Sequence, residues 1–263
     1  MIKTFLHNII LKLTKIFYGS RIVSKPYIND NTRLFYEISQ HLNFLFQGKI
    51  KYENNLQQKI KGFINRGDVV FDIGGNIGQY ALMFSELVGN KGKVFSFEPD
   101  YKNFSFLQFN TNINKKKNLF CLNNGIGAEE GILEFYRDSE TGGRMGSFKR
   151  EFVKKRYKGF KEQVEIIKCD SLINKYGIPN FVKIDVEGFE YEVLKGLKSV
   201  LKETIFFIEV REETKEKVFQ YFKHKNYTCY WIDFENKLIK KNQEIPGFAN
   251  LIFFPPNKTI EFN

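Results

Sequence analysis

The stretch VVFDIGGNIGQY at residues 69–80 decides the expected fold. An apolar run ends in Asp72, and a cluster of glycines follows it directly. This order predicts a short buried strand, a tight glycine turn and a helix that begins near residue 77. In open sheets built from alternating strands and helices, ligands bind beyond the carboxyl ends of the strands, so this turn is the first candidate site.

Strand and helix patterns alternate along the rest of the chain. Beyond the strand at 69–72 and the helix at 77–88, strands are predicted at 93–98, 119–123, 132–136, 164–169, 181–185, 204–210, 227–232 and 250–255, with helices at 54–66, 100–113, 190–201 and 214–225. The alternation predicts a mainly parallel sheet covered by helices on both faces. No helix separates the last two strands, which are therefore expected to form a terminal antiparallel hairpin.

The glycine spacing favours S-adenosylmethionine over a dinucleotide as the ligand of this turn. A dinucleotide fingerprint would need glycine where Ile73 stands, and no phosphate-binding GxxxxGK[ST] motif occurs. The sequence instead reads D-x-G-x-x-x-G, with Asp72, Gly74 and Gly78. Asp72 could bind the ammonium of the methionyl group directly or through water, and free amides at the helix start could meet its carboxylate. A tight turn without a ligand is the alternative.

Glu98 follows the glycine turn at the end of the second predicted strand, in FSFEPD. An acid in this position can accept hydrogen bonds from both ribose hydroxyls, which indicates a nucleoside site without distinguishing the cofactor. At the end of the third strand, Asn124 and Gly125 in LNNG suit the edge of an adenine ring. Asparagine is also an ordinary turn residue, so a structural role is the alternative there.

A second distinctive stretch, FVKIDVEGFEYEVLKG, covers residues 181–196. An acid that ends an apolar strand is costly to desolvate without a task, so Asp185 is the first candidate for a catalytic base. Glu187 and Glu209, the latter at the end of the next strand, could share this task. The three acids could instead hold a divalent cation that lowers the pKa of an acceptor hydroxyl.

The segments VFDIGGNIGQY, FEPD and KIDVEGFEYEVLKG, in this order, resemble the FkbM family of S-adenosylmethionine-dependent methyltransferases. The similarity runs from about Gly67 to Val210, and the family usually has alanine where this chain has Gly75. The resemblance implies a Rossmann-like class I methyltransferase fold with a seven-stranded sheet, and O-methylation of a sugar, nucleotide sugar or glycan in surface polysaccharide or natural-product biosynthesis. The expected cofactor contacts are Asp72, Gly74, Gly75, Asn76, Gly78, Glu98, Pro99, Asn124, Gly125 and Asp185.

A basic insertion at residues 139–161 interrupts the alternation of strand and helix. Its glycines suggest a mobile loop, and its lysines and arginines suggest contact with an anionic substrate, such as a nucleotide-linked sugar or a charged glycan. A solvated helix face is the alternative. The candidate substrate contacts are Arg144, Ser147, Lys154, Lys155 and Arg156.

Residues 1–50 are expected to form an N-terminal helical extension, including a segment from about Arg33 to Leu45, ahead of a methyltransferase domain at 51–263. Apolar residues recur at helical spacing over 1–17, with lysines between them, which predicts an amphipathic helix. Packing on the domain, a homodimer contact and peripheral binding to the inner membrane face are the alternatives for it. The stretch is too short and too charged to span a bilayer.

The net charge of +11 suits an anionic partner. An RNA methyltransferase is the alternative function, but DVEG stands where base methyltransferases commonly have [ND]PP[YF], so no nucleic-acid partner is expected. Three dispersed cysteines without a CxxC pair argue against a disulfide framework or structural zinc and favour a cytoplasmic location. The absence of a YxxxK pair argues against an epimerase or oxidoreductase on the same sheet.

Overall fold

The computed structural model describes residues 17, 19–138, 145–153, 160–199, 201–233, 235–256 and 258. The amphipathic helix expected over 1–17 lies, except for Phe17, outside the described residues. So do Arg144, Lys154, Lys155 and Arg156 of the basic insertion. Within the described ranges, no helix combines the length and apolarity that crossing a membrane requires.

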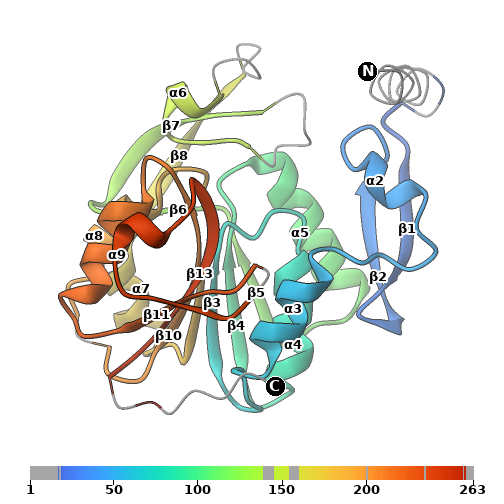
Figure 1. Cartoon of the computed structure of the whole chain (residues 1–263). Coiled ribbons are helices and arrows are strands. Elements are labelled where there is room, and N and C mark those ends of the chain that lie inside the picture. Colours follow the sequence, from blue (N-terminus) through green and yellow to red (C-terminus); the bar gives the residue numbers. More distant parts are fainter. Residues whose placement is uncertain are drawn as a thin grey trace, which may run out of the picture.

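A central sheet of eight strands runs through the molecule (Figure 1). In spatial order the strands are β12 (Lys237–Ile239), β11 (Thr228–Trp231), β13 (Phe248–Phe254), β10 (Ile205–Arg211), β9 (Phe181–Ile184), β3 (Val69–Ile73), β4 (Lys93–Phe97) and β5 (Leu119–Leu122). The five strands from β10 to β5 are parallel, and β13 runs antiparallel between β10 and β11. The expected parallel sheet and its terminal antiparallel pair are confirmed. An eighth strand arises because β12 folds back onto β11.

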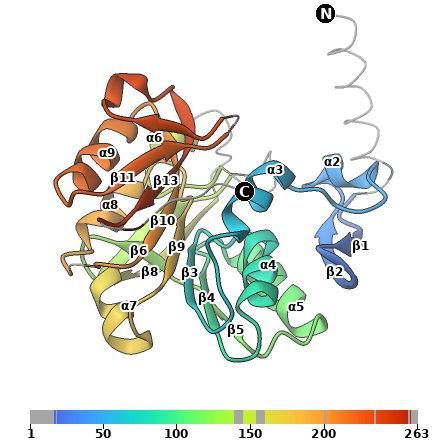
Figure 2. The same ribbon diagram turned by 60° about the horizontal axis from the view of Figure 1, so that its bottom comes forward.

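Helices cover both faces of this sheet, as Figures 1 and 2 show. The helices α3 (Asn54–Lys61), α4 (Gln79–Val88) and α5 (Tyr101–Ile113) belong to one face, and α7 (Cys169–Tyr176), α8 (Glu190–Lys195) and α9 (Lys215–Lys223) to the other. Successive strand residues point to opposite faces. Val70 accordingly packs in the first hydrophobic core and Phe71 in the second, and both are fully buried.

A smaller sheet lies at the carboxyl edge of the main one. It consists of β6 (Gly125–Gly127), β8 (Lys161–Lys168) and β7 (Gly131–Tyr136), in this spatial order. The strands predicted at 132–136 and 164–169 are therefore real but pair with each other rather than with the central sheet. The basic insertion connects β7 to β8, and its described part contains the short helix α6 (Arg150–Val153).

The expectation of a helical extension is wrong for residues 22–37. They form a β-hairpin of β1 (Ile22–Tyr27) and β2 (Asn29–Glu37), and only α2 (Leu42–Leu45) is helical in the predicted segment. Thr32, Leu34 and Tyr36 are each almost fully buried, and the residues between them are more exposed. This period of two is that of a strand with one face on the core. From sequence alone, a short apolar segment of this kind is not reliably distinguished from a helix.

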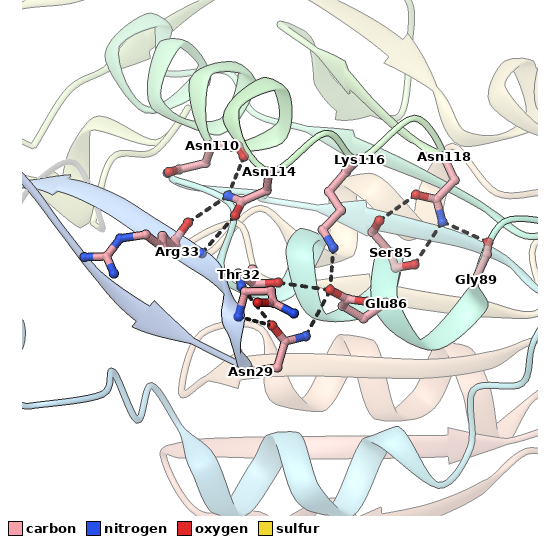
Figure 3. Close-up of polar contacts among 11 residues, drawn as sticks. Asn29, Thr32, Arg33, Ser85, Glu86, Gly89, Asn110, Asn114, Lys116 and Asn118 are labelled. Atoms are coloured by element: carbon pink, nitrogen blue, oxygen red, sulfur yellow. Dashed lines mark hydrogen bonds and ion pairs between the residues drawn. The ribbon is translucent and has the colours of Figure 1, made fainter.

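Asn110 of α5 and Asn114, the residue that directly follows this helix, attach the hairpin to the rest of the fold. The Arg33 amide donates to Asn114 Oδ1 (2.8 Å), and Asn114 Nδ2 donates back to the Arg33 carbonyl (2.7 Å) (Figure 3). Phe35 makes the same pair of bonds with Asn110, at 2.8 and 3.0 Å. The two side-chain amides thus satisfy the outer edge of β2 as a neighbouring strand would.

A second polar contact holds the turn end of the hairpin. Glu86 of α4 accepts hydrogen bonds from Asn29 and Thr32, and it pairs with the ammonium of Lys116 (Figure 3). The hairpin is therefore fixed to α4 and α5, two of the three helices that cover this face of the sheet. This fixed position matters for the site because the chain continues from the hairpin into the residues that line it.

Candidate active site

A cavity of about 330 Å³ opens where β3, β4, β9 and β10 end. This volume lies within the usual range for small-molecule sites. Its lining includes most of the predicted cofactor and catalytic residues. These are Gly74, Gly75, Asn76, Glu98, Pro99, Asn124, Gly125, Asp185, Glu187 and Glu209.

Gly74 brings the ends of two neighbouring strands together. Its φ of +90° lies in the left-handed region, which residues with side chains rarely adopt. A Cβ at this position would also lie 1.9 Å from the carbonyl oxygen of Asp185. Gly74 is therefore required both for the turn and for the close approach of β3 and β9. Gly78 precedes α4 and, unlike Gly74, does not line the cavity.

Asp72 lies outside the cavity, where it has no direct access to a ligand. Its carboxylate is completely buried beneath the turn and is absent from the cavity lining. Ser96 Oγ donates to Oδ2 (2.8 Å), and the ammonium of Lys183 lies 3.7 Å from Oδ1. Burial raises the pKa of Asp72 although Lys183 opposes this shift. The expectation that Asp72 binds the ammonium of the methionyl group directly is thus corrected, because Asp72 supports the turn from beneath. Contact with the ammonium through water stays a prediction.

Glu98 lies in the cavity with its carboxylate oriented by backbone donors. The Asn76 amide donates to Oε2 (2.7 Å) and the Asp100 amide to Oε1 (2.9 Å). Burial and the nearby charge of Asp100 raise the pKa of Glu98 to about 8. Each oxygen keeps acceptor capacity beyond its one amide, so the carboxylate can accept bonds from two hydroxyls of a ligand.

An apolar wall with few polar groups forms the cavity end near β6. Asn124 lines this end and donates to the Glu165 carboxylate (2.9 Å), and Phe148 packs on Phe135 with ring centroids 5.0 Å apart. The neighbouring Asn123, which sequence reasoning did not select, donates to the carbonyls of Glu98 and Pro99. Such a wall suits a flat ring that has polar atoms at its edge.

Three carboxylates converge at the other end of the cavity. One oxygen each of Asp185, Glu187 and Glu209 can be chosen so that all three lie within 4.8 Å of one another. Burial and the charge of Asp185 raise the pKa of Glu187 to about 8 and that of Glu209 to about 10. This oxygen-only set has the chemistry of a site for a hard divalent cation as well as that of a proton-transfer site.

Arg211 was missed by sequence reasoning and lies within this cluster. Its Nη2 atom is 2.5 Å from a Glu187 oxygen and 3.2 Å from a Glu209 oxygen. Its guanidinium also faces the ring of Phe248, 5.3 Å from the ring centroid. Arg211 follows Glu209 by two residues on β10, and residues two apart on a strand point to the same face. This spacing could have predicted that Arg211 lies beside Glu209.

Lys183 is the second buried cation of the site. Only 3% exposed, it lies 3.3 Å from Asp185 Oδ2 and donates to the Gly74 carbonyl at 3.3 Å. Its ammonium also faces the ring of Tyr80, at 4.9 Å from the centroid. Lys183 thereby links the strand that carries Asp185 to the glycine turn and offsets the charge of Asp72 beneath it.

Tyr52 and Glu53 reach the cavity from the segment between the hairpin and α3. The Tyr80 hydroxyl donates to Glu53 Oε2 at 2.6 Å. No local sequence signal marks either residue, because their contact with the site depends on how the preceding hairpin packs. The cavity lining within the described residues therefore carries five acids, Glu53 included, against Lys183 and Arg211, although the whole chain is basic.

Ser147 does not reach a substrate in the predicted manner. It is fully buried, and its Oγ donates to the Glu187 carbonyl (2.8 Å) and accepts from the Lys149 amide (3.1 Å). The expectation of a substrate contact is therefore corrected, since the hydroxyl holds the backbone that presents Glu187. Its neighbours Gly146 and Phe148 do line the cavity.

The strand order and a cavity at the carboxyl ends of β3, β4, β9 and β10 define a class I methyltransferase fold. The chain belongs to a particular family of this class, since the methyltransferase FkbM domain matches residues 72–229. The resemblance seen in the motifs is confirmed. The N-terminal hairpin, Tyr52 and Glu53 lie outside the matched residues.

One relative is the hexuronic acid methyltransferase AglP of Haloferax volcanii, 31% identical over 145 residues. The match covers 54% of this chain and 54% of AglP, so the chain spans about half the length of that relative. Among solved structures, a precorrin-6y C5,15-methyltransferase of Geobacter metallireducens is 11% identical with a TM-score of 0.48, over 80% of this chain and 90% of its own. A tRNA m1G37 methyltransferase of M. jannaschii is 13% identical with a TM-score of 0.47, over 92% and 58%.

Proposed function

We propose that the protein transfers a methyl group from S-adenosylmethionine to a hydroxyl of a sugar, nucleotide sugar or glycan. The observation that carries this proposal is the cluster of Asp185, Glu187 and Glu209 beside the glycine turn. Bound S-adenosylmethionine would supply an electrophilic methyl on a sulfonium. A hydroxyl becomes a good nucleophile only as its proton leaves, and a carboxylate within reach can take that proton.

The residues of the cavity fit this cofactor in their chemistry. Glu98 offers acceptors for the two ribose hydroxyls, and the wall near Phe148 suits the adenine ring. The lining also offers carboxyl oxygens, from Glu53 and Asp185 among others, as acceptors for the ammonium of this cofactor.

Asp185 is the proposed base. Its side chain is 27% exposed, against 10% for Glu187 and 13% for Glu209, so it is the member of the cluster most open to an acceptor. The raised pKa values of the two glutamates favour their protonated forms at neutral pH. Asp185 is instead held in position by the ammonium of Lys183, which lies 3.3 Å from its Oδ2 atom.

The relative named a hexuronic acid methyltransferase supports a sugar as acceptor. An acid sugar offers two kinds of methyl acceptor, its hydroxyls and its carboxylate. Methylation of a hydroxyl gives an ether that survives mild alkali, whereas methylation of a carboxylate gives an ester that does not.

The test is a screen with methyl-labelled S-adenosylmethionine against nucleotide sugars, acidic glycans and RNA, followed by alkali treatment of the product. We expect an alkali-stable label on a sugar. Asp185→Asn should lower turnover by about 10²-fold or more while S-adenosylhomocysteine still binds, and Asp30→Asn, at a side chain 98% exposed, is the matched control. Label in RNA alone, or full turnover by Asp185→Asn, would refute the proposal.

A divalent cation at the same cluster can be tested in the same assay. Arg211 already supplies positive charge to Glu187 and Glu209, so we expect turnover to survive dialysis against EDTA. Loss of turnover that added Mg²⁺ restores would assign the cluster to a cation instead.

A further inference from the structure

Glu53 has an unusual backbone conformation next to the candidate site. Its φ of 42° and ψ of 41° are left-handed, a region that non-glycine residues adopt at a cost. Helix capping does not explain this, because the Glu53 side chain makes no capping hydrogen bond to α3. The conformation does place the side chain in the cavity lining.

The carboxylate of Glu53 is held in a defined position there. The Tyr80 hydroxyl donates to one of its oxygens at 2.6 Å. Burial is the main cause that raises the pKa of Glu53, and the charge of Asp185 adds to it, so the two acids repel each other across the cavity. A ligand with a positive group between them would relieve this repulsion.

The cations already present act on Glu53 without contacting it, since the charge of Lys183 lowers its pKa only in part. Lys183 is shared among Asp72, Asp185 and the Gly74 carbonyl. Arg211 pairs with Glu187 and Glu209 at the other side. Within the part of the chain that the structure describes, Glu53 has no ion pair within 4.0 Å, so its carboxyl group is open to a positive group of a ligand.

We propose that Glu53 binds the ammonium of the methionyl group of S-adenosylmethionine, a role that rests on the proposed cofactor. It takes over the contact that the buried Asp72 does not offer directly. The family match begins only at residue 72, so the segment that follows the N-terminal hairpin completes the cofactor site from outside the matched domain. The hairpin then serves the site by fixing the chain just before Tyr52 and Glu53.

The test compares two ligands by calorimetry in the full chain. S-adenosylhomocysteine carries the ammonium, and 5′-methylthioadenosine has the same nucleoside without the amino-acid end. Glu53→Gln keeps the shape but not the charge. We expect it to raise the Kd of S-adenosylhomocysteine about 10- to 100-fold and to leave that of 5′-methylthioadenosine within about twofold. Glu129→Gln, at a side chain 75% exposed, is the matched control and should change neither Kd.

Two further variants separate binding from folding. Glu53→Gly removes the strained side chain, so we expect a thermal midpoint at least equal to that of the parent together with the same loss of S-adenosylhomocysteine affinity. Glu53→Asp keeps the charge and should recover part of that affinity. Equal weakening of both ligands by Glu53→Gln, or unchanged binding of both with a higher KM for the acceptor, would overturn the assignment. Because this readout is binding, a failure to find a sugar acceptor would refute the proposed function without deciding the role of Glu53.

Discussion

Replacement of Gly75 by alanine tests how tightly the glycine turn packs on its neighbours. Gly75 does not lie in the left-handed region, so alanine suits its backbone, and the FkbM family usually has alanine there. In this chain, however, a Cβ would lie 2.1 Å from the Oγ of Ser96. Ser96 would have to turn away and would lose its 2.8 Å bond to Asp72.

The expected loss follows from that bond and from the crowding. A hydrogen bond to a charged group contributes about 1.5–3 kcal/mol, and an extra methyl group in a packed interior costs about 1–3 kcal/mol. We therefore expect Gly75→Ala to lower the free energy of unfolding by about 2–4 kcal/mol. Ser96→Ala loses the same bond and should cost about 2 kcal/mol. The double variant should cost no more than Ser96→Ala alone, because the new methyl group fills the space that the hydroxyl leaves.

Urea unfolding of the parent and the three variants gives the coupling between the two positions. We expect the two losses to fall short of additivity by about 2 kcal/mol or more. Gly62→Ala is the matched control, since its Cβ would meet only the Lys59 carbonyl at 3.9 Å, and it should change stability by less than about 0.5 kcal/mol. Losses that add to within about 0.5 kcal/mol would refute the reasoning.

Two further predictions concern the hairpin contact and the acidic cluster. Asn110 is fully buried and bonds both backbone groups of Phe35, so Asn110→Ala should lower the free energy of unfolding by about 2–4 kcal/mol. Asn114 is only half-buried, and Asn114→Ala should lower it by about 1 kcal/mol. Equal losses in urea unfolding would contradict this difference. The pKa of Glu209 is raised from 4.5 to about 10 in the folded protein, so its contribution to stability is complete below pH 4.5 and is lost progressively as the pH rises toward 10. Glu209→Gln removes this loss, so its stability relative to the parent should rise by up to about 4 kcal/mol between about pH 5 and pH 8, whereas parallel pH profiles would show that the carboxylate is not desolvated as described.

The elements of the central sheet could be predicted because each carries its own local signal. The strand at 69–72 and the acid at 98 stand beside clear turns, and the observed β3 and β4 end within a residue or so of their predicted ends. The hairpin at 22–37 could not be predicted in the same way. Which of its residues are buried depends on how the hairpin packs against α4 and α5. The alternation of buried and exposed residues is therefore visible in the structure but not in the sequence.

The residues of the candidate site likewise divide into those that the sequence predicted and those that only the packing reveals. Motifs identified Glu98, Asp185 and the glycine turn, because residue type and position at a strand end are visible in the sequence. They did not reveal that Asp72 lies beneath the turn, since burial depends on Lys183 and Ser96 from two other strands. Glu53 and Arg211 were missed for a related reason: one reaches the cavity through tertiary packing, and the other resembles an ordinary surface arginine after a strand.

The pairing of Asn110 and Asn114 with β2 has a consequence for how the hairpin finds its register. Four residues of a helix rise about 6.0 Å, and two residues of a strand rise about 6.6 Å, so the two spacings agree over one step and drift apart over the next. A helix can therefore match a strand at two positions but not along its length. If β2 shifted by one residue, backbone groups of its neighbouring residues could still meet the asparagines, but the buried side chains of Thr32, Leu34 and Tyr36 would turn to the opposite face. The two asparagines thus require two backbone positions at the spacing of alternate strand residues, and the buried face of β2 decides which residues occupy them.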